Sequence, residues 1–196
     1  MPRPRGFDEE EVLAAACNRF WDNGYAATSL DDLMSATGLG KGSLYGAFGD
    51  KHQLFLRALD DYRERFLCGI RSTLLEGTGS PWRRLKAFVM AIAEGASTEQ
   101  GLRGCLLANS SAELNNRDPE VLARSRSTFA ALEDVLAQCL EMARDRGEIA
   151  AEADPREQAR LLLAVVEGIR FLGQTGIGRA ATRQIARSAL DAVPKG

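Results

Sequence analysis

The sequence has very few of the side chains on which most enzymes depend. Among its 196 residues there is one histidine, His52, so every histidine-based metal site or catalytic pair would have to use that side chain. Lys51 stands next to it, and a neighbouring cation is unfavourable for a general base. We therefore expect His52 to be an exposed residue near a helix start, and the chain to be neither an enzyme nor a binder of a metal or cofactor.

Paired cysteines and long apolar runs are also absent. The cysteines are far apart and form no C-x-x-C pair, which argues against a zinc module and a secreted disulfide framework. They are Cys17, Cys68, Cys105 and Cys139. No apolar run approaches the roughly 18 residues of a membrane span, and the first ten residues lack the apolar segment of a signal peptide. We expect reduced thiols, a cytoplasmic location and no membrane partner.

β-Branched residues are sparse and no alternating pattern is sustained, so strands are not expected. Apolar residues instead recur every three or four positions, which predicts an all-α fold of about nine helices. The predicted helices cover residues 8–23, 29–38, 41–48, 55–74, 82–92, 104–114, 122–143, 155–174 and 179–193. They suggest two domains, a three-helix module within residues 1–52 and a larger helical body over residues 53–196.

Residues 37–51 contain five glycines, although a glycine inside a helix costs about 1 kcal/mol relative to alanine. Two short helices joined by a glycine turn are typical of a helix-turn-helix, whose second helix enters the DNA major groove. Gly38 provides the turn, and Gly40 occupies the cap of the second helix. Because Leu44 and Phe48 are four residues apart and face the core, Gly42 and Gly46 face outward.

An outer helix face with few side chains allows the backbone to approach a DNA groove closely, and the helix N-terminus can donate N–H groups to phosphate. The predicted partner is therefore double-stranded DNA. The candidate contact residues are Thr28, Ser29, Lys41, Gly42, Ser43, Tyr45, Gly46, Ala47 and Lys51. Arg3 and Arg5 resemble a minor-groove arm. Residues 1–52 hold five Lys/Arg against eight Asp/Glu, so binding would depend on local placement of cations and on dimerisation.

Two stretches, GYAATSLDDL and GLGKGSLYGAFGDKHQLF, resemble the TetR/AcrR family of transcriptional regulators. Its corresponding segments follow G-Y-x-x-T-S-x-x-x-[IL] and G-[VL]-x-K-G-[ST]-L-Y-x-x-F-x-x-K-x-x-L-[FL]. The resemblance implies a homodimer paired through its last two helices, a ligand pocket in the larger domain, and repression that a ligand releases. Gly40 replaces the family's usual serine cap, and Gly46 and Ala47 replace larger residues, which favours readout of DNA shape.

Two other glycine patterns are excluded as nucleotide sites by their context. GLGKGS has Gly42 where a P-loop requires Ser or Thr after the lysine. GIGRAA, residues 176–181, matches part of a dinucleotide fingerprint but follows no predicted strand and leaves too little chain for the fold. The alternative from another class is a helical protein-interaction or enzyme scaffold that has lost DNA binding.

Helices 155–174 and 179–193 are the candidate dimer surface, with intrachain core as the alternative. An inducer pocket within the larger domain is expected to combine apolar walls with polar anchors, and each candidate has plain core or surface as its alternative. The candidates are Phe66, Ile70, Phe88, Met90, Cys105, Asn109, Ser110, Glu113, Phe129, Leu132, Glu167 and Phe171. Cys105 follows Arg103 at a predicted helix start, where a thiol pKa is lowered. It is interpreted either as an electrophile or redox sensor or as a buried structural cysteine.

Overall fold

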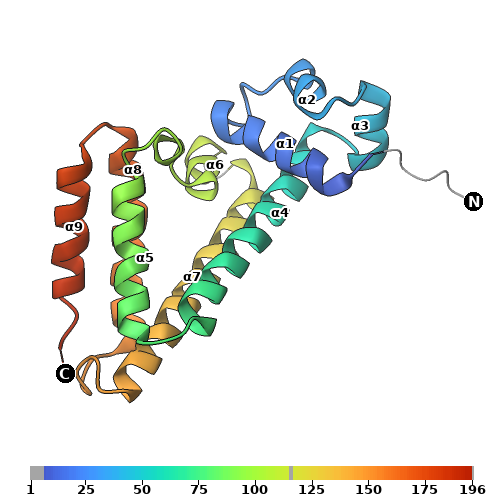
Figure 1. The fold of residues 1–196 in the computed structure, drawn as a ribbon. Helices are drawn as coiled ribbons and strands as arrows, with labels where there is room; N and C mark the ends of the chain where they lie inside the picture. Colours follow the sequence, from blue (N-terminus) through green and yellow to red (C-terminus); the bar gives the residue numbers. More distant parts are fainter. Residues whose placement is uncertain (1–6, 115–116, 196) are drawn as a thin grey trace, which may run out of the picture. The chain divides into compact units, whose positions relative to one another are not determined.

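The computed structural model describes residues 7–114 and 117–195, and Figure 1 shows the helices along the chain. The helices are α1 (Glu9–Asn23), α2 (Leu30–Thr37), α3 (Lys41–Phe48), α4 (Lys51–Arg71), α5 (Pro81–Gly95), α6 (Leu106–Leu114), α7 (Pro119–Asp145), α8 (Pro155–Gln174) and α9 (Arg179–Asp191), with a π-helical turn η1 (Ser72–Glu76) and a 3-10 turn η2 (Gly101–Arg103). No strand occurs in these described residues, so the predicted all-α class is confirmed. None of their helices is both long and apolar enough to cross a membrane.

Side-chain caps begin several of these helices at the predicted places. The Asp8 carboxylate accepts the N–H groups of Glu10 and Glu11 at the start of α1. Asp154 caps α8 in the same way, with Pro155 in the first turn. Each cap satisfies backbone donors that have no partner within the helix. Short polar side chains in the sequence therefore fix where these helices start.

Contacts divide the chain into two compact units that differ from the suggested division at residue 52. Unit 1 contains the described residues of Met1–Arg65 and Asn109–Arg124, and unit 2 contains those of Phe66–Ala108 and Ser125–Gly196. Helices α4, α6 and α7 therefore each contribute residues to both units. The end of α6 and the start of α7 belong with the N-terminal helices.

In unit 2, helices α5, α8 and α9 pack against one another around a continuous apolar core. The buried Thr182 hydroxyl of α9 donates a hydrogen bond to the Ala93 carbonyl of α5 at 2.7 Å. Gly173 of α8 lies so close to α5 that an added Cβ would be 2.5 Å from the Ala96 carbonyl oxygen. This packing holds the end of α5 against α8.

Glu148 joins the turn after α7 to the start of α5 within unit 2. Its Oε2 accepts the Ser80 hydroxyl at 2.7 Å and the Trp82 N–H at 2.8 Å. Burial alone would raise the pKa of Glu148, but these hydrogen bonds and the nearby Arg146 and Arg84 lower it below its usual value. The ionised carboxylate therefore stabilises the folded state.

We predict that Glu148→Gln lowers the free energy of unfolding by about 1 kcal/mol at neutral pH, because one acceptor for the α5 cap is weakened. A carboxyl group with a lowered folded-state pKa contributes stability above its unfolded pKa, and this contribution is lost as pH falls. The difference between wild type and variant should therefore shrink below about pH 4.5. Urea denaturation at several pH values measures it. Glu141→Gln, on an exposed part of α7, is the matched control, and an equal effect there would contradict the prediction.

Candidate DNA-binding site

Helices α2 and α3 form the predicted helix-turn-helix. At the start of α2 the Ser29 hydroxyl accepts the Asp32 N–H at 3.1 Å, and the Asp32 carboxylate accepts the Ser29 N–H at 2.8 Å. This reciprocal capping box fixes the first turn. Gly38 ends α2 with a φ of 69°, in the left-handed region that favours glycine. The chain then turns within two residues and starts α3 after Gly40.

One face of α3 is buried and the opposite face carries little side-chain material. Leu44 and Phe48 are 0% and 4% exposed and hold the helix to unit 1. Lys41, Gly42, Ser43 and Gly46 are exposed, whereas Tyr45 and Ala47 are half-buried. A Cβ added to Gly42 or Gly46 would lie in open space, with no described atom within 4 Å apart from the adjoining residues and the nearby backbone of α3 itself. Packing within the described part of the chain therefore gives no reason for these two glycines.

The amino end of α3 has backbone donors and no side chain that caps them. Gly40 is extended, with φ −71° and ψ 159°, and makes no side-chain cap. The first turn also contains no acidic residue. The first N–H groups of a helix lack intrahelical acceptors and attract anions. With Lys41 and Ser43 beside them, they form a surface suited to phosphate oxygens.

The other predicted contact residues lie in varied surroundings. Thr28 is fully buried, and its hydroxyl donates to the Gly24 carbonyl at 2.6 Å. Ser29 is exposed, but its hydroxyl takes part in the capping box. The Lys51 ammonium lies 4.5 Å from the centre of the Tyr25 ring. The predicted arm of Arg3 and Arg5 lies outside the described residues.

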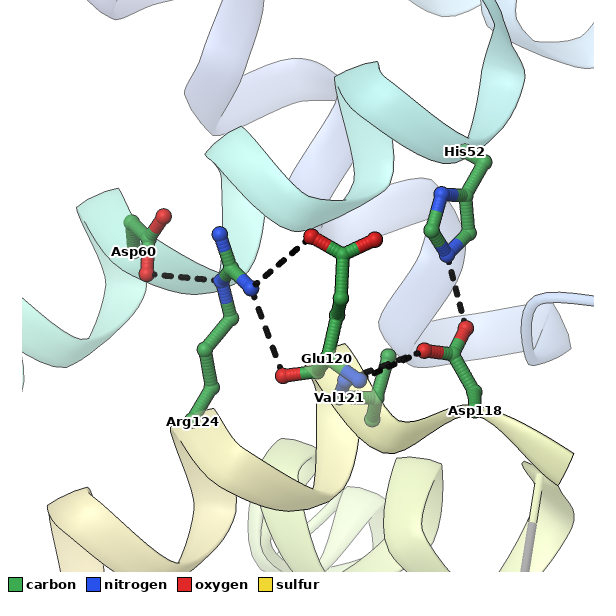
Figure 2. Close-up of polar contacts among 6 residues, drawn as sticks. All are labelled: His52, Asp60, Asp118, Glu120, Val121 and Arg124. Atoms are coloured by element: carbon green, nitrogen blue, oxygen red, sulfur yellow. Dashed lines mark hydrogen bonds and ion pairs between the residues drawn. The ribbon is translucent and has the colours of Figure 1, made fainter. Parts of the chain in front are cut away.

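The described residues between Asn109 and Arg124 make polar contacts in unit 1 that no local sequence pattern predicts. The Glu113 carboxylate, expected as a ligand anchor, accepts the N–H groups of Tyr25 and Ala26. Figure 2 shows two further pairs: His52 Nε2 lies 2.7 Å from Asp118 Oδ2, and the Arg124 Nε–H donates to Asp60 at 3.0 Å. The expectation of an exposed His52 is therefore wrong, because its side chain is 29% exposed and paired.

Asp118 both pairs with His52 and caps α7. Its Oδ1 accepts the N–H groups of Glu120 and Val121, each at 3.1 Å (Figure 2). Burial would raise the pKa of Asp118, but the Val121 N–H, the His52 ring and the Glu120 N–H together lower it below its usual value. Asp118 therefore holds the start of α7 to the first turn of α4.

Two family models match this chain. Residues 12–58 match the family described as "Bacterial regulatory proteins, tetR family", and residues 81–189 match "Tetracyclin repressor-like, C-terminal domain". The chain belongs to the TetR family. As a TetR-family protein with an exposed helix-turn-helix, it is a DNA-binding transcriptional regulator, and the predicted family and general function are confirmed.

Similar proteins match this chain along nearly their whole length. The HTH-type transcriptional repressor ComR of Escherichia coli K12 is 31% identical over 193 residues, which cover 98% of this TetR-family chain and 92% of ComR. A cysteine mutant of the TetR-family regulator CifR, solved with 26-bp operator DNA, is 26% identical with a TM-score of 0.85 over 98% of this chain and 100% of that one. The structure of reduced NemR of E. coli matches with a TM-score of 0.86 and covers 95% of this chain and 97% of NemR. At 19% identity, this match supports a shared fold and nothing further.

In unit 2 of the TetR-family regulator, three of the predicted ligand-pocket residues lie around one arginine. Arg170 pairs with Glu167 at 2.8 Å, and its guanidinium lies 5.3 Å from the centre of the Phe66 ring. Cys105 is buried beside Glu167 and Arg170. A pocket of about 240 Å³ adjoins this group. It is lined by Ile92, Gly95, Ala96, Thr98, Gln100, Gly101, Gly104 and Arg170.

The remaining predicted pocket residues are spread over the helices. Ile70 and Leu132 are buried in the core of unit 2, where Phe88 and Met90 pack against it. Phe129 is half-buried on α7, and Asn109 and Ser110 lie on α6. Phe171 is 66% exposed on α8. None of these residues lines the 240 Å³ pocket, so their part in ligand binding stays a prediction.

The expected lowering of the Cys105 pKa is wrong. Burial raises the pKa of this thiol to about 11, and the negative charge of Glu167 adds to the effect of burial. The Arg170 guanidinium and the Ala108 N–H act in the opposite direction but are outweighed. A thiol with this pKa is almost entirely protonated at neutral pH, and the protonated form is a poor nucleophile.

We predict that iodoacetamide at neutral pH modifies the exposed Cys68 of the native protein before Cys105. A rise in pKa from 9.0 to about 11 leaves roughly a hundredfold less thiolate, and burial further restricts access. Mass spectrometry of peptides after timed labelling measures both rates. Cys68→Ser should remove most labelling of the native protein, and denaturation should restore labelling at Cys105. Equal rates at the two thiols before denaturation would contradict the prediction.

Proposed function

We propose that this regulator is a repressor that binds a near-palindromic operator as a homodimer, and that a small molecule bound in unit 2 releases it from DNA. The observation that carries the proposal is the bare outer face of α3. Two of its eight residues are exposed glycines with open space around them. Contact with a partner outside the described chain would explain why these two positions carry no side chain.

The energetics of α3 support DNA as that partner. Each interior glycine destabilises a helix by about 1 kcal/mol relative to alanine. Without a Cβ at Gly42 and Gly46, the α3 backbone can lie closer to the bases and the phosphates. Lys41 and the uncapped N–H groups provide positive charge and donors at the same end. Because Gly46 and Ala47 have little capacity for base contacts, we propose that DNA shape contributes to recognition.

The named activities of similar proteins support repression. ComR is named as a repressor, and CifR was solved with operator DNA. The operator would lie in the cytoplasm, where we place this protein. The inducer would enter unit 2, and the raised pKa of Cys105 favours a non-covalent small molecule over direct attack on that thiol.

Exposed apolar residues on α8 support a two-fold dimer. Leu161 and Phe171 of α8 are 42% and 66% exposed, and Ile177, just after α8, is 41% exposed. Large apolar side chains exposed to water are unfavourable, and several of them along one helix and its end favour an interaction surface there. We propose that α8 and α9 of two copies pair, which would place two α3 helices on two half-sites of one operator.

We predict that Gly42→Ala with Gly46→Ala stabilises the free protein while weakening operator binding. Stability should rise by about 0.5–1 kcal/mol per site because both Cβ atoms have open space, and affinity should fall about tenfold or more because the backbone is held away from the groove. Urea denaturation and fluorescence anisotropy, using a duplex from upstream of the protein's own gene, measure the two effects. Gly69→Ala, at an exposed position of α4 with open space, should stabilise the protein without changing affinity.

Unchanged affinity in the double variant would contradict close approach of α3. If the wild type shows no salt-dependent binding to any upstream duplex, the alternative of a helical interaction scaffold that has lost DNA binding is favoured.

We predict that Phe171→Glu separates the dimer, because burying a charged side chain in the proposed apolar interface is unfavourable. Sedimentation equilibrium at micromolar concentration should show mainly monomer, and operator affinity should fall as cooperation between half-sites is lost. Cys68→Glu, which adds the same charge at an exposed position of α4, should remain dimeric. A monomeric wild type, or a dimeric Phe171→Glu variant, would contradict the proposed interface.

A further inference from the structure

Glu113, the acidic residue before the end of α6, binds the turn between α1 and α2 with both of its carboxylate oxygens. Oε2 accepts the Tyr25 N–H at 2.9 Å, and Oε1 accepts the Ala26 N–H at 2.7 Å. Gly24 precedes these donors with φ 78°, and a Cβ there would lie 2.8 Å from Glu113 Oε2. The turn therefore needs glycine both for its backbone conformation and for the approach of this carboxylate.

Other groups fix the same turn within unit 1. The buried Thr28 hydroxyl donates to the Gly24 carbonyl at 2.6 Å. Thr28 is the residue before Ser29, which caps α2. The Tyr25 ring packs against Phe55 of α4 at a centroid distance of 4.9 Å. The Lys51 ammonium lies 4.5 Å from the centre of the same ring. The position of Tyr25 therefore influences both the start of α2 and a predicted DNA-contacting cation.

We propose that Glu113 is a positioning residue for operator binding: it holds the turn at Tyr25 and Ala26, and through this turn it positions α2 and Lys51 for DNA. This inference rests on the proposed function. Glu113 itself makes no DNA contact in this proposal. Glu113 lies on the part of α6 that belongs to unit 1, whereas Leu106–Ala108 of the same helix belong to unit 2.

Electrostatics allow a positioning role to be separated from a simple charge effect. Glu113 is anionic, so its removal makes unit 1 less repulsive to phosphate and should by itself tighten DNA binding. Loss of a positioning contact acts in the opposite direction. A weaker operator complex after removal of this negative charge therefore reports the contact with the turn.

The test compares Glu113→Gln with Glu120→Gln in the full-length protein. Glutamine keeps the size of glutamate, but its amide presents one oxygen and one NH₂ to two N–H donors, so one hydrogen bond is replaced by a repulsive contact. Glu120 lies in the same segment, is 57% exposed and reaches only 4.0 Å from Arg124. We expect about tenfold weaker operator binding for Glu113→Gln, and unchanged or slightly tighter binding for Glu120→Gln.

The salt dependence of the affinity distinguishes positioning from direct contact. Loss of a phosphate contact lowers the slope of log K against log salt by about one. We expect this for Lys41→Ala. For Glu113→Gln we expect an unchanged slope, because the bound variant keeps Lys41 and Lys51 at the phosphates and loses affinity only through the free energy needed to order its turn. Hydrogen exchange should show faster exchange of the Tyr25 and Ala26 amides in Glu113→Gln, with a urea midpoint close to that of Glu120→Gln.

The proposal is overturned if Glu113→Gln binds the operator as tightly as Glu120→Gln, whether or not the two amides exchange faster. It is also overturned if the variant has a reduced salt slope, because Glu113 would then act at the phosphate contacts themselves. A wild type that binds no duplex is a different result and contradicts the proposed function instead.

Discussion

The eight residues of helix α3 must pack one face against unit 1 and leave the opposite face bare for DNA. Most features of unit 1 follow from this constraint. The two buried residues of α3 are Leu44 and Phe48, while two glycines reduce its intrinsic helical stability. A short helix of this composition would not persist alone in water. Its position must therefore be imposed by what surrounds it, which makes the capping box of α2 and the left-handed Gly38 part of the DNA-binding site.

The surroundings of α3 are themselves held by polar contacts distant in sequence. Glu113 contacts the turn after α1. Asp118 contacts His52, and Arg124 contacts Asp60 (Figure 2). Each pair is partly exposed, so each contributes modestly to stability. Their shared effect is geometric, because together they fix the turn and the first turns of α4 against residues 109–124. The DNA-binding unit is consequently larger than the helix-turn-helix motif.

The sequence was sufficient for features encoded locally and insufficient for those that depend on packing. The buried positions of Leu44 and Phe48 follow from their spacing along a helix, and Ser29 and Asp32 carry the capping signal within four residues. The contact between Glu113 and Tyr25 joins residues 88 apart, and no local pattern marks either one. Cys105 shows how local reasoning can fail: a helix start and a nearby arginine lower a thiol pKa, but burial, which only the fold determines, has the larger effect. Likewise, nothing in the sequence around Glu113 distinguishes a side chain that binds a ligand from one that accepts backbone N–H groups.

The strength of the Glu113 contact also sets how much it can contribute to regulation. A ligand shifts a conformational equilibrium only by the difference between its affinities for the two states. Allosteric coupling typically amounts to about 1–3 kcal/mol, and charge-assisted hydrogen bonds at a partly exposed site are of the same order. A much stronger, buried clamp would hold the turn against any inducer, and a contact with no net strength would transmit nothing. Two short but solvent-accessible hydrogen bonds from one carboxylate therefore have a strength suited to a contact that must hold α2 on the operator and still be released.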